Sequence, residues 1–182
     1  MQKDQSPEFT IEVMRLEDVE AATDMRLQSW LDTYVNDDMG VSREWIKSRN
    51  AEQRSPETQA SRRERFSKGV ADGTFAAWIA RDRDMVIIGS ATPFVDDEGV
   101  QHVGSLYVDK RWHSSGVGAA LMQKVIDWFD PTKPIELGVV SYNKRAKAFY
   151  RKWGFEEVRG SEALFADKIP EIKMIRKPKE DV

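Results

Sequence analysis

The segment that follows the apolar run VGSLYV is rich in small residues: it reads SSGVGA and leads into a pattern typical of a helix. Small side chains leave backbone N–H groups accessible, and the first N–H groups of a helix lack internal partners. Together with the helix dipole, they make a site for an anion such as phosphate. Three interpretations compete: an ordinary turn, a general phosphate site, and a site for one particular cofactor. The residues concerned are Ser114, Ser115, Gly116, Val117, Gly118 and Ala119.

Two familiar phosphate-binding patterns are absent from this segment. The Walker A pattern GxxxxGK[ST] does not occur, and the dinucleotide pattern GxGxxG fails because Leu121 occupies the place of the third glycine. No second βαβ unit precedes the segment, as a dinucleotide-binding domain would require. The glycines are therefore expected to serve a turn or a different phosphate-bearing ligand.

The residues on both sides of the glycines resemble the signatures of the GNAT family of N-acetyltransferases. Residues 106–122, LYVDKRWHSSGVGAALM, are similar to its cofactor signature, which is an LYV-like strand end followed by Q/R-x-x-G-x-G/A. Residues 143–155, NKRAKAFYRKWGF, resemble its second signature, N-x-x-A-x-x-F-Y-x-x-x-G-F. The two motifs stand in the right order and spacing. The resemblance is sharp over residues 100–158 and only architectural before them.

The resemblance implies that the chain uses acetyl-CoA as a co-substrate. In the family, the pantetheine arm pairs with the backbone at the end of the fourth strand, beside a splay between two parallel strands. The pyrophosphate binds the amides that open the next helix. Carried over to the matching positions, the implied cofactor residues are Leu106, Tyr107, Val108, His113, Ser114, Ser115, Gly116, Val117, Gly118, Ala119, Asn143, Lys147 and Tyr150.

Three residues depart from the family pattern. His113 stands where Gln or Arg is usual, and an imidazole donates to phosphate less strongly than a guanidinium fork. Ser114 and Ser115 replace the commoner Gly and Lys, which removes one cation. Binding of the cofactor's 3′-phosphate is therefore expected to depend on one or more of four other cations. These are Lys110, Arg111, Lys144 and Lys147.

The resemblance places Tyr150 near the thioester sulfur. A phenol with a pKa near 10 can protonate a departing thiolate, so Tyr150 is our candidate general acid. The same tyrosine could instead be an ordinary core residue, because its helix face is apolar. The candidates for the base, or for holding a catalytic water, are Glu98, Gln101 and His102, and the last could also be a simple strand histidine. The backbone N–H of Val108 is the implied oxyanion donor.

The acceptor site is the least defined part of the sequence. The stretch SWLDTYVNDDMG carries Trp30 and Tyr34 among the carboxylates Asp32, Asp37 and Asp38. Aromatic rings and carboxylates together suit a cationic amine, through cation–π contacts and charge pairing. A helix packing face followed by an acidic turn would explain the same residues. A polyamine, a peptide N-terminus, a lysine and an aminoglycoside all remain candidate acceptors.

Composition excludes several classes of function. The 182 residues carry a formal net charge of -3, with a sequence pI of about 5.6, and no basic field that would indicate a nucleic-acid partner. The absence of cysteine removes disulfides and thiolate sites, and two histidines make a metal centre unexpected. With neither a secretory signal nor a membrane-spanning run, we expect a cytoplasmic protein without membrane contact.

The chain is expected to form one domain over residues 1–182, with loose tails at 1–8 and 178–182. Hydrophobic periodicity predicts a mixed, mostly antiparallel sheet with one parallel β-α-β crossover and helices on both faces, an α/β fold. The resemblance adds the splay at that crossover, as in the acyl-CoA N-acyltransferase fold. The expected strands are 9–16, 75–81, 85–95, 100–108, 134–140, 155–160 and 168–177. The expected helices begin at Glu17, near Ser42 and after the N-cap Ser55, the last ending at Gly69, and also span 116–129 and 143–154.

These observations predict an N-acetyltransferase that moves an acetyl group from acetyl-CoA to a primary amine of a small molecule or peptide, by direct attack in a ternary complex. A non-catalytic acyl-CoA-binding module of the same fold is the main alternative. An unrelated nucleotide-phosphate domain would instead be expected to bind ATP or ADP in competition with acetyl-CoA. Members of the family often dimerise, so a homodimer is a further expectation.

Overall fold

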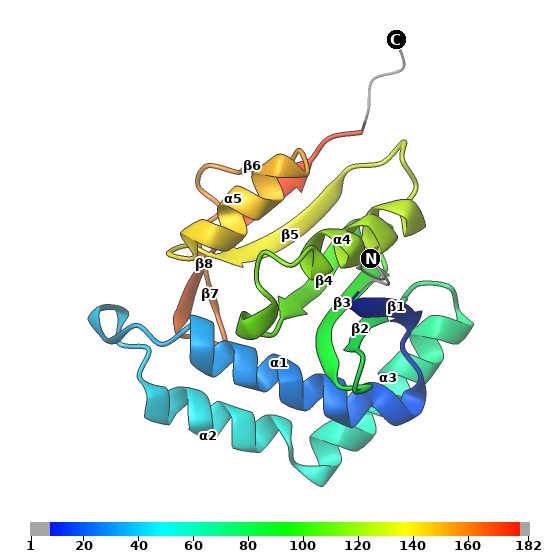
Figure 1. Cartoon of the computed structure of the whole chain (residues 1–182). Coiled ribbons are helices and arrows are strands. Elements are labelled where there is room, and N and C mark those ends of the chain that lie inside the picture. Colours follow the sequence, from blue (N-terminus) through cyan, green and yellow to red (C-terminus); the bar gives the residue numbers. More distant parts are fainter. Residues whose placement is uncertain (1–7, 179–182) are drawn as a thin grey trace, which may run out of the picture.

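An eight-stranded mixed sheet forms the centre of the computed structural model, which describes residues 8–178 (Figure 1). The strand order is β1-β2-β3-β4-β5-β8-β6, and β7 pairs with β8 beside this path. Most of the two expected tails, residues 1–7 and 179–182, lies outside the described residues. The strands are β1 (Phe9–Val13), β2 (Trp78–Asp82), β3 (Ile87–Val95), β4 (Gln101–Val108), β5 (Ile135–Val140), β6 (Glu156–Glu157), β7 (Ala163–Phe165) and β8 (Ile169–Arg176).

Helices cover both faces of this sheet, as the sequence predicts (Figure 1). The first three pack on one face and the last two on the other, since each group shares a separate hydrophobic cluster with the strands. Ser55 caps its helix as expected, because its hydroxyl accepts the Thr58 N–H at 3.2 Å. The helices are α1 (Val19–Thr33), α2 (Arg43–Gln53), α3 (Pro56–Ala71), α4 (Val117–Trp128) and α5 (Lys144–Lys152).

The parallel strands β4 and β5 separate soon after they meet. They pair only at Gln101 with Ile135 and at His102 with Glu136, so the later residues of both strands have no partner across this gap. A bulge lies nearby, where the register of β3 and β4 shifts between Thr92 and Pro93. The predicted parallel crossover and its splay are confirmed. The splay leaves backbone N–H and C=O groups of two strand edges accessible to a ligand.

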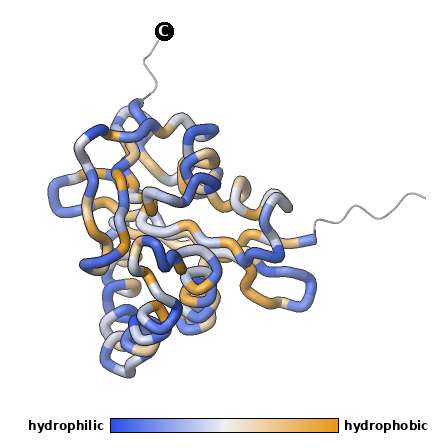
Figure 2. Tube along the Cα trace, turned by 90° about the vertical axis from the view of Figure 1, so that its left-hand side faces the viewer, coloured by the Kyte–Doolittle hydropathy of each residue, from blue (hydrophilic) through white to orange (hydrophobic). Residues whose placement is uncertain are grey.

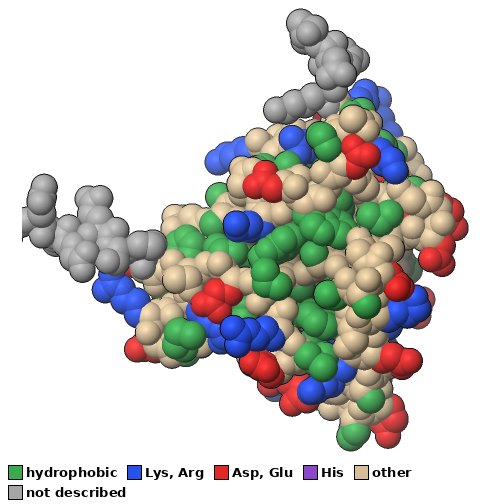
Figure 3. All heavy atoms as spheres, turned by 90° about the vertical axis from the view of Figure 1, so that its right-hand side faces the viewer, with side chains coloured by type: hydrophobic (Ala, Val, Ile, Leu, Met, Phe, Trp, Pro, Cys, Tyr) green, Lys and Arg blue, Asp and Glu red, His purple; other side chains and the backbone are tan. Residues whose placement is uncertain are grey.

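The hydrophobic residues gather on the strands and on the inner faces of the helices. Figure 2 shows the apolar residues along the central sheet and the hydrophilic ones on the outer helices. In the view of Figure 3, basic and acidic side chains are interspersed around a more hydrophobic middle. Within residues 8–178, no helix combines the length and the hydrophobicity needed to cross a membrane.

The end of α3 differs from the expectation. The sequence predicts that this helix ends at Gly69, but α3 continues to Ala71, and the left-handed residue is Gly73, with φ +69°. Gly69 instead allows a close approach: a Cβ added there would lie 2.6 Å from the Cβ of Phe75. Phe75 is held in place, since its N–H donates to the Gly69 carbonyl at 3.1 Å. Because Gly69 has no side chain, α3 can pack closely against the segment that follows it.

Because of this close contact, we expect replacement of Gly69 by alanine to have the opposite effect to the usual one in a helix. In an ordinary helix interior, Gly→Ala stabilises by about 0.5–1 kcal/mol. For Gly69→Ala we expect a loss of about 1–3 kcal/mol in the free energy of unfolding, because the new methyl overpacks against Phe75. Urea unfolding would measure it, with Ser67→Ala on the exposed face of α3 as the control. A gain in stability for Gly69→Ala would contradict this account.

Candidate active site

A cavity of about 820 Å³ occupies the splay between β4 and β5. It reaches both faces of the sheet, because α1 contributes to its wall on one side and α4 and α5 on the other. Most of the expected cofactor residues line it. These are Leu106, Tyr107, Val108, His113, Ser114, Gly116, Gly118, Ala119, Asn143 and Tyr150.

The amino end of α4 opens into this cavity without a cap. Gly116 is the N-cap residue, with a left-handed φ of +94°, and no side chain accepts a hydrogen bond from the first turn. The amides of Val117, Gly118 and Ala119 therefore have no internal partner. A Cβ added at Gly118 would meet nothing closer than 3.7 Å, so the protein itself does not require glycine there. This geometry suits an anionic group bound directly against the backbone.

Two expected cofactor residues do not present their side chains to the cavity. The side chain of Val117 is fully buried in the core, so only its amide faces a ligand. The hydroxyl of Ser115 donates to the Trp112 carbonyl at 2.7 Å and closes the turn before α4. Only the Val117 amide is therefore available to a ligand, because the Ser115 N–H also donates to the Trp112 carbonyl, at 3.3 Å.

The ring of His113 is occupied by the protein. Its Nε2 lies 3.1 Å from the Val108 carbonyl oxygen, which can only accept a hydrogen bond. Burial lowers the pKa of His113, and the nearby Arg145 lowers it further, so the ring is neutral at neutral pH. Nε2 therefore carries the ring proton and donates it to Val108. The ring fixes the loop after β4 and has no second N–H for a phosphate.

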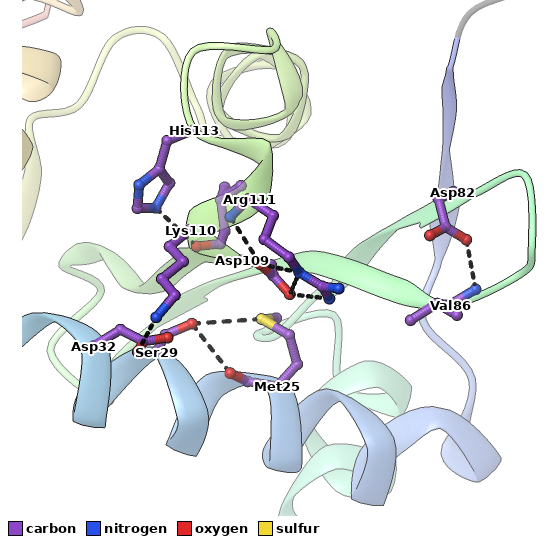
Figure 4. A network of polar contacts seen from close by, with 10 residues as sticks. Met25, Ser29, Asp32, Asp82, Val86, Asp109, Lys110, Arg111 and His113 are labelled. Atoms are coloured by element: carbon purple, nitrogen blue, oxygen red, sulfur yellow. Dashed lines mark hydrogen bonds and ion pairs between the residues drawn. The ribbon is translucent and has the colours of Figure 1, made fainter.

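The cations around the cavity differ from those expected. Lys147 does not line it, since its side chain turns to Glu157, with Nζ 3.5 Å from the carboxylate. Lys110 and Arg111 form ion pairs with Asp32 and Asp109, at 2.8 and 2.7 Å (Figure 4). The exposed Lys144, the last of the four candidates, does not line the cavity either. The basic side chains that do line it, besides the two histidines, are Arg145 and Lys152.

Tyr150 lies in the cavity wall with its ring in the core. The ring packs edge-on against Phe149 and Phe155, and 8% of the residue is exposed. Burial and the neighbouring Tyr107 raise its pKa, so the phenol keeps its proton at neutral pH. Within residues 8–178, no group makes a hydrogen bond with its hydroxyl. The hydroxyl is therefore free to make a hydrogen bond with a ligand in the cavity.

A hydrogen-bonded aromatic cluster joins α1 to β4. The Trp30 indole N–H donates to the Tyr107 hydroxyl at 3.0 Å, and the Tyr34 hydroxyl lies 3.0 Å from the same oxygen. Burial and Tyr107 raise the pKa of Tyr34 well above its ordinary value. Tyr34 lines the cavity, but Trp30 is buried behind it, which corrects the expectation that Trp30 contacts the substrate.

Of the three candidates for the base, only His102 lines the cavity. Its Nε2 lies 2.7 Å from Asp96, and its ring stacks on Phe94. Glu98 is exposed in the turn before β4 and does not line the cavity. Gln101 is buried: its side-chain oxygen accepts the Asp130 N–H at 2.7 Å and its nitrogen donates to the Asp130 carbonyl at 3.1 Å. Gln101 therefore anchors the loop after α4, and the expectation of a catalytic role for it is wrong.

Sequence reasoning missed one carboxylate of the cavity. Glu171, in the middle of β8, is the acidic residue of the cavity wall. Burial raises its pKa above the ordinary value. No hydrogen bond or ion pair reaches its carboxylate from any other residue that the structure describes. Residues 8–178 contain no cluster of three or more potential metal ligands, so Glu171 is not part of such a group.

Comparisons with a family model and with known proteins both indicate an acetyltransferase family. A model of the acetyltransferase (GNAT) family matches residues 41–155. Uncharacterized N-acetyltransferases of Mycobacterium bovis and Mycobacterium tuberculosis are 35% identical over 96 residues, which is 50% of this chain and 60% of those proteins. The matching segment thus spans less than two thirds of these relatives.

Solved structures share the fold at lower identity. The PaiA N-acetyltransferase of Thermoplasma acidophilum, in complex with coenzyme A, has a TM-score of 0.72 at 21% identity, over 93% of this chain and 98% of that one. A GNAT-family acetyltransferase of Staphylococcus aureus has a TM-score of 0.67 at 19% identity, over 94% and 99%. At such identities the likeness establishes the architecture alone.

Proposed function

Because this chain belongs to the acetyltransferase (GNAT) family, we propose that it is an N-acetyltransferase that moves the acetyl group of acetyl-CoA to a primary amine in a ternary complex. The observation that carries the proposal is the cavity in the splay, which has an uncapped helix start on one face of the sheet and reaches the opposite face. One substrate can enter from each face and meet the other between β4 and β5.

Acetyl-CoA supplies the acetyl group as a thioester, and the residues present fit its phosphates and its arm. The amides of residues 117–119 would receive the pyrophosphate, with Gly118 allowing close approach. The Asp109 N–H donates to the Ile88 carbonyl at 2.8 Å, on the β3 side. Since successive residues of a strand point to alternate sides, the N–H and C=O of Val108 point into the splay. The Val108 carbonyl already accepts the His113 ring N–H, so the backbone groups of Leu106, which point to the same side, would pair with the pantetheine arm.

The proton transfers can be assigned to two side chains of the wall. Tyr150 is protonated at neutral pH and would give its proton to the leaving thiolate. His102 would accept the proton of the acceptor ammonium, because Asp96 holds its Nε2 and leaves Nδ1 as the free ring atom. The Val108 N–H would donate to the oxyanion of the tetrahedral intermediate. Attack by the freed amine and departure of the thiolate then give the acetamide and CoA.

The test is release of the CoA thiol from acetyl-CoA in the presence of pools of amines, amino acids, aminoglycosides and N-terminal peptides. We expect release with one pool and a product heavier by one acetyl group in mass spectrometry. Tight acetyl-CoA binding without release in any pool would favour the non-catalytic module. Full competition by ATP or ADP, without acetyl-CoA selectivity, would overturn the assignment of the cofactor.

A further inference from the structure

The cavity has opposite charges at its two ends. Arg145 and Lys152 lie on the α5 side, and Arg145 is close enough to His113, in the loop before α4, to lower its pKa. Glu171 lies on β8, where Phe165 and Tyr34 also line the wall. The end with the helix start and the cations suits a polyanionic ligand, and the carboxylate end suits a cation. We infer that Glu171 binds the ammonium group of the acceptor, an inference that rests on the proposed function.

The surrounding backbone makes room for this carboxylate. Glu171 faces Val140 of β5 and Ala163 of β7 across two strand pairings. Both of its oxygens lie 3.0 Å from the position that a Cβ of Gly138 would occupy. Any larger residue at position 138 would displace the carboxylate from β5. Gly138 also lies only two residues beyond Glu136, the last β5 residue that pairs with β4. The carboxylate therefore lies near the point where the splay opens.

Among residues 8–178, Glu171 has no positive partner, although a lysine lies on each side of it in the chain. Lys173 extends to Glu136, with the two charged groups 2.7 Å apart. Lys168, just before β8, lies over the ring of Trp45 at 5.7 Å. Since partial burial raises the pKa of the unpaired carboxyl, its ionised form lacks compensation in the protein alone. An ammonium group would supply that compensation, and it would be held by a charge-assisted hydrogen bond.

The acidic residues considered from the sequence do not provide this site. Asp32 is paired with Lys110, and Asp37 and Asp38 are exposed in the turn after α1 and do not line the cavity. Aromatic rings do line the acidic end, and their faces attract cations. The acceptor class that fits is a cationic primary amine. An amine that also carries a carboxylate would be repelled by Glu171.

The experiment compares steady-state rates for three cationic amines, 1,4-diaminobutane, benzylamine and kanamycin, with those for 4-aminobutanoate. We expect at least one cationic amine to be acetylated and 4-aminobutanoate to be the poorer substrate. In Glu171→Gln the KM for the cationic amine should rise about tenfold, since hydrogen bonds to charged groups contribute about 1.5–3 kcal/mol. The kcat should change less than threefold, and acetyl-CoA affinity should not change. Glu171→Asp should restore part of the affinity for the amine.

Glu162→Gln is the matched control, because Glu162 is exposed and lies outside the cavity. An unchanged KM in Glu171→Gln would overturn the inference, as would a preference for 4-aminobutanoate. If acetyl-CoA binds but no acceptor reacts, the proposed function is wrong, and the inference about Glu171 is tested by a second measurement. Calorimetric titration of the three amines into the CoA-loaded protein then still tests Glu171. Binding that is lost in Glu171→Gln supports the ammonium site, and equal binding or none overturns it.

Discussion

The Tyr150→Phe variant is expected to lower kcat by about 100-fold or more, because general acid catalysis typically contributes about 10²- to 10⁴-fold. The change removes one oxygen atom and keeps the ring that packs against Phe149 and Phe155. The hydroxyl has no hydrogen-bond partner among residues 8–178, so its loss leaves no unpaired group behind. The fold and the affinity for acetyl-CoA should therefore remain close to those of the wild type. Stopped-assay kinetics would measure kcat, and calorimetry would measure the affinity for acetyl-CoA.

Tyr142→Phe is the matched control for this variant. The Tyr142 hydroxyl donates to the Tyr34 carbonyl at 2.6 Å, and Tyr142 does not line the cavity. Its loss should lower stability by about 1 kcal/mol, the usual net contribution of a hydrogen bond, and leave kcat nearly unchanged. Should Tyr150→Phe keep the wild-type kcat while product is formed, Tyr150 would be a packing residue, and the thiolate would take its proton from water.

Local signals predicted most of the elements and their order. Alternating apolar residues, short polar linkers and the Ser55-Pro56 helix start are read from a few neighbouring positions, and the structure confirms them. The strand β7 was not predicted. Its hairpin to β8 turns at Ala166 and Asp167, which have φ values of +52° and +58°. The pairs Asn-Gly, Asp-Gly and Gly-Gly usually mark such a turn, and Ala166-Asp167 is none of these. Pairing with β8 holds this turn, and that pairing is not visible in the local sequence.

That the loop after β4 and the start of α4 line one cavity was also predictable, because their residues are adjacent in the chain. The first turn of α4 offers uncapped backbone amides, and glycines mark such places in a sequence. The acceptor end was not predictable in this way. Glu171 lies among alternating residues of an ordinary strand, and its place beside Gly138 depends on the register of β5 with β8. Likewise, Gln101 and Arg145 could be assigned only once their neighbours in space were known.

The amides at the start of α4 account for the second large effect that we expect. In Gly118→Val the Cβ itself has room, since Phe149 and Val108 lie 3.7 Å away, but the two methyl groups extend into the cavity. They would hold the pyrophosphate away from the amides of Val117 and Ala119. Charge-assisted hydrogen bonds contribute about 1.5–3 kcal/mol each, so losing two of them should weaken acetyl-CoA binding by about 100-fold or more. Calorimetric titration with acetyl-CoA measures this loss.

Gln123→Val provides the comparison, because it places the same side chain on an exposed position of α4 outside the cavity. Valine has a higher helix propensity than glycine and a slightly lower one than glutamine, so in each variant the change of propensity alters stability by well under about 1 kcal/mol. A large difference in affinity at similar stability would therefore come from the position of the methyl groups against the ligand. If both variants bind acetyl-CoA as the wild type does, the phosphates do not rest on α4. The cationic side chains Arg145 and Lys152 would then have to hold them, and their replacement by Met would be the next measurement.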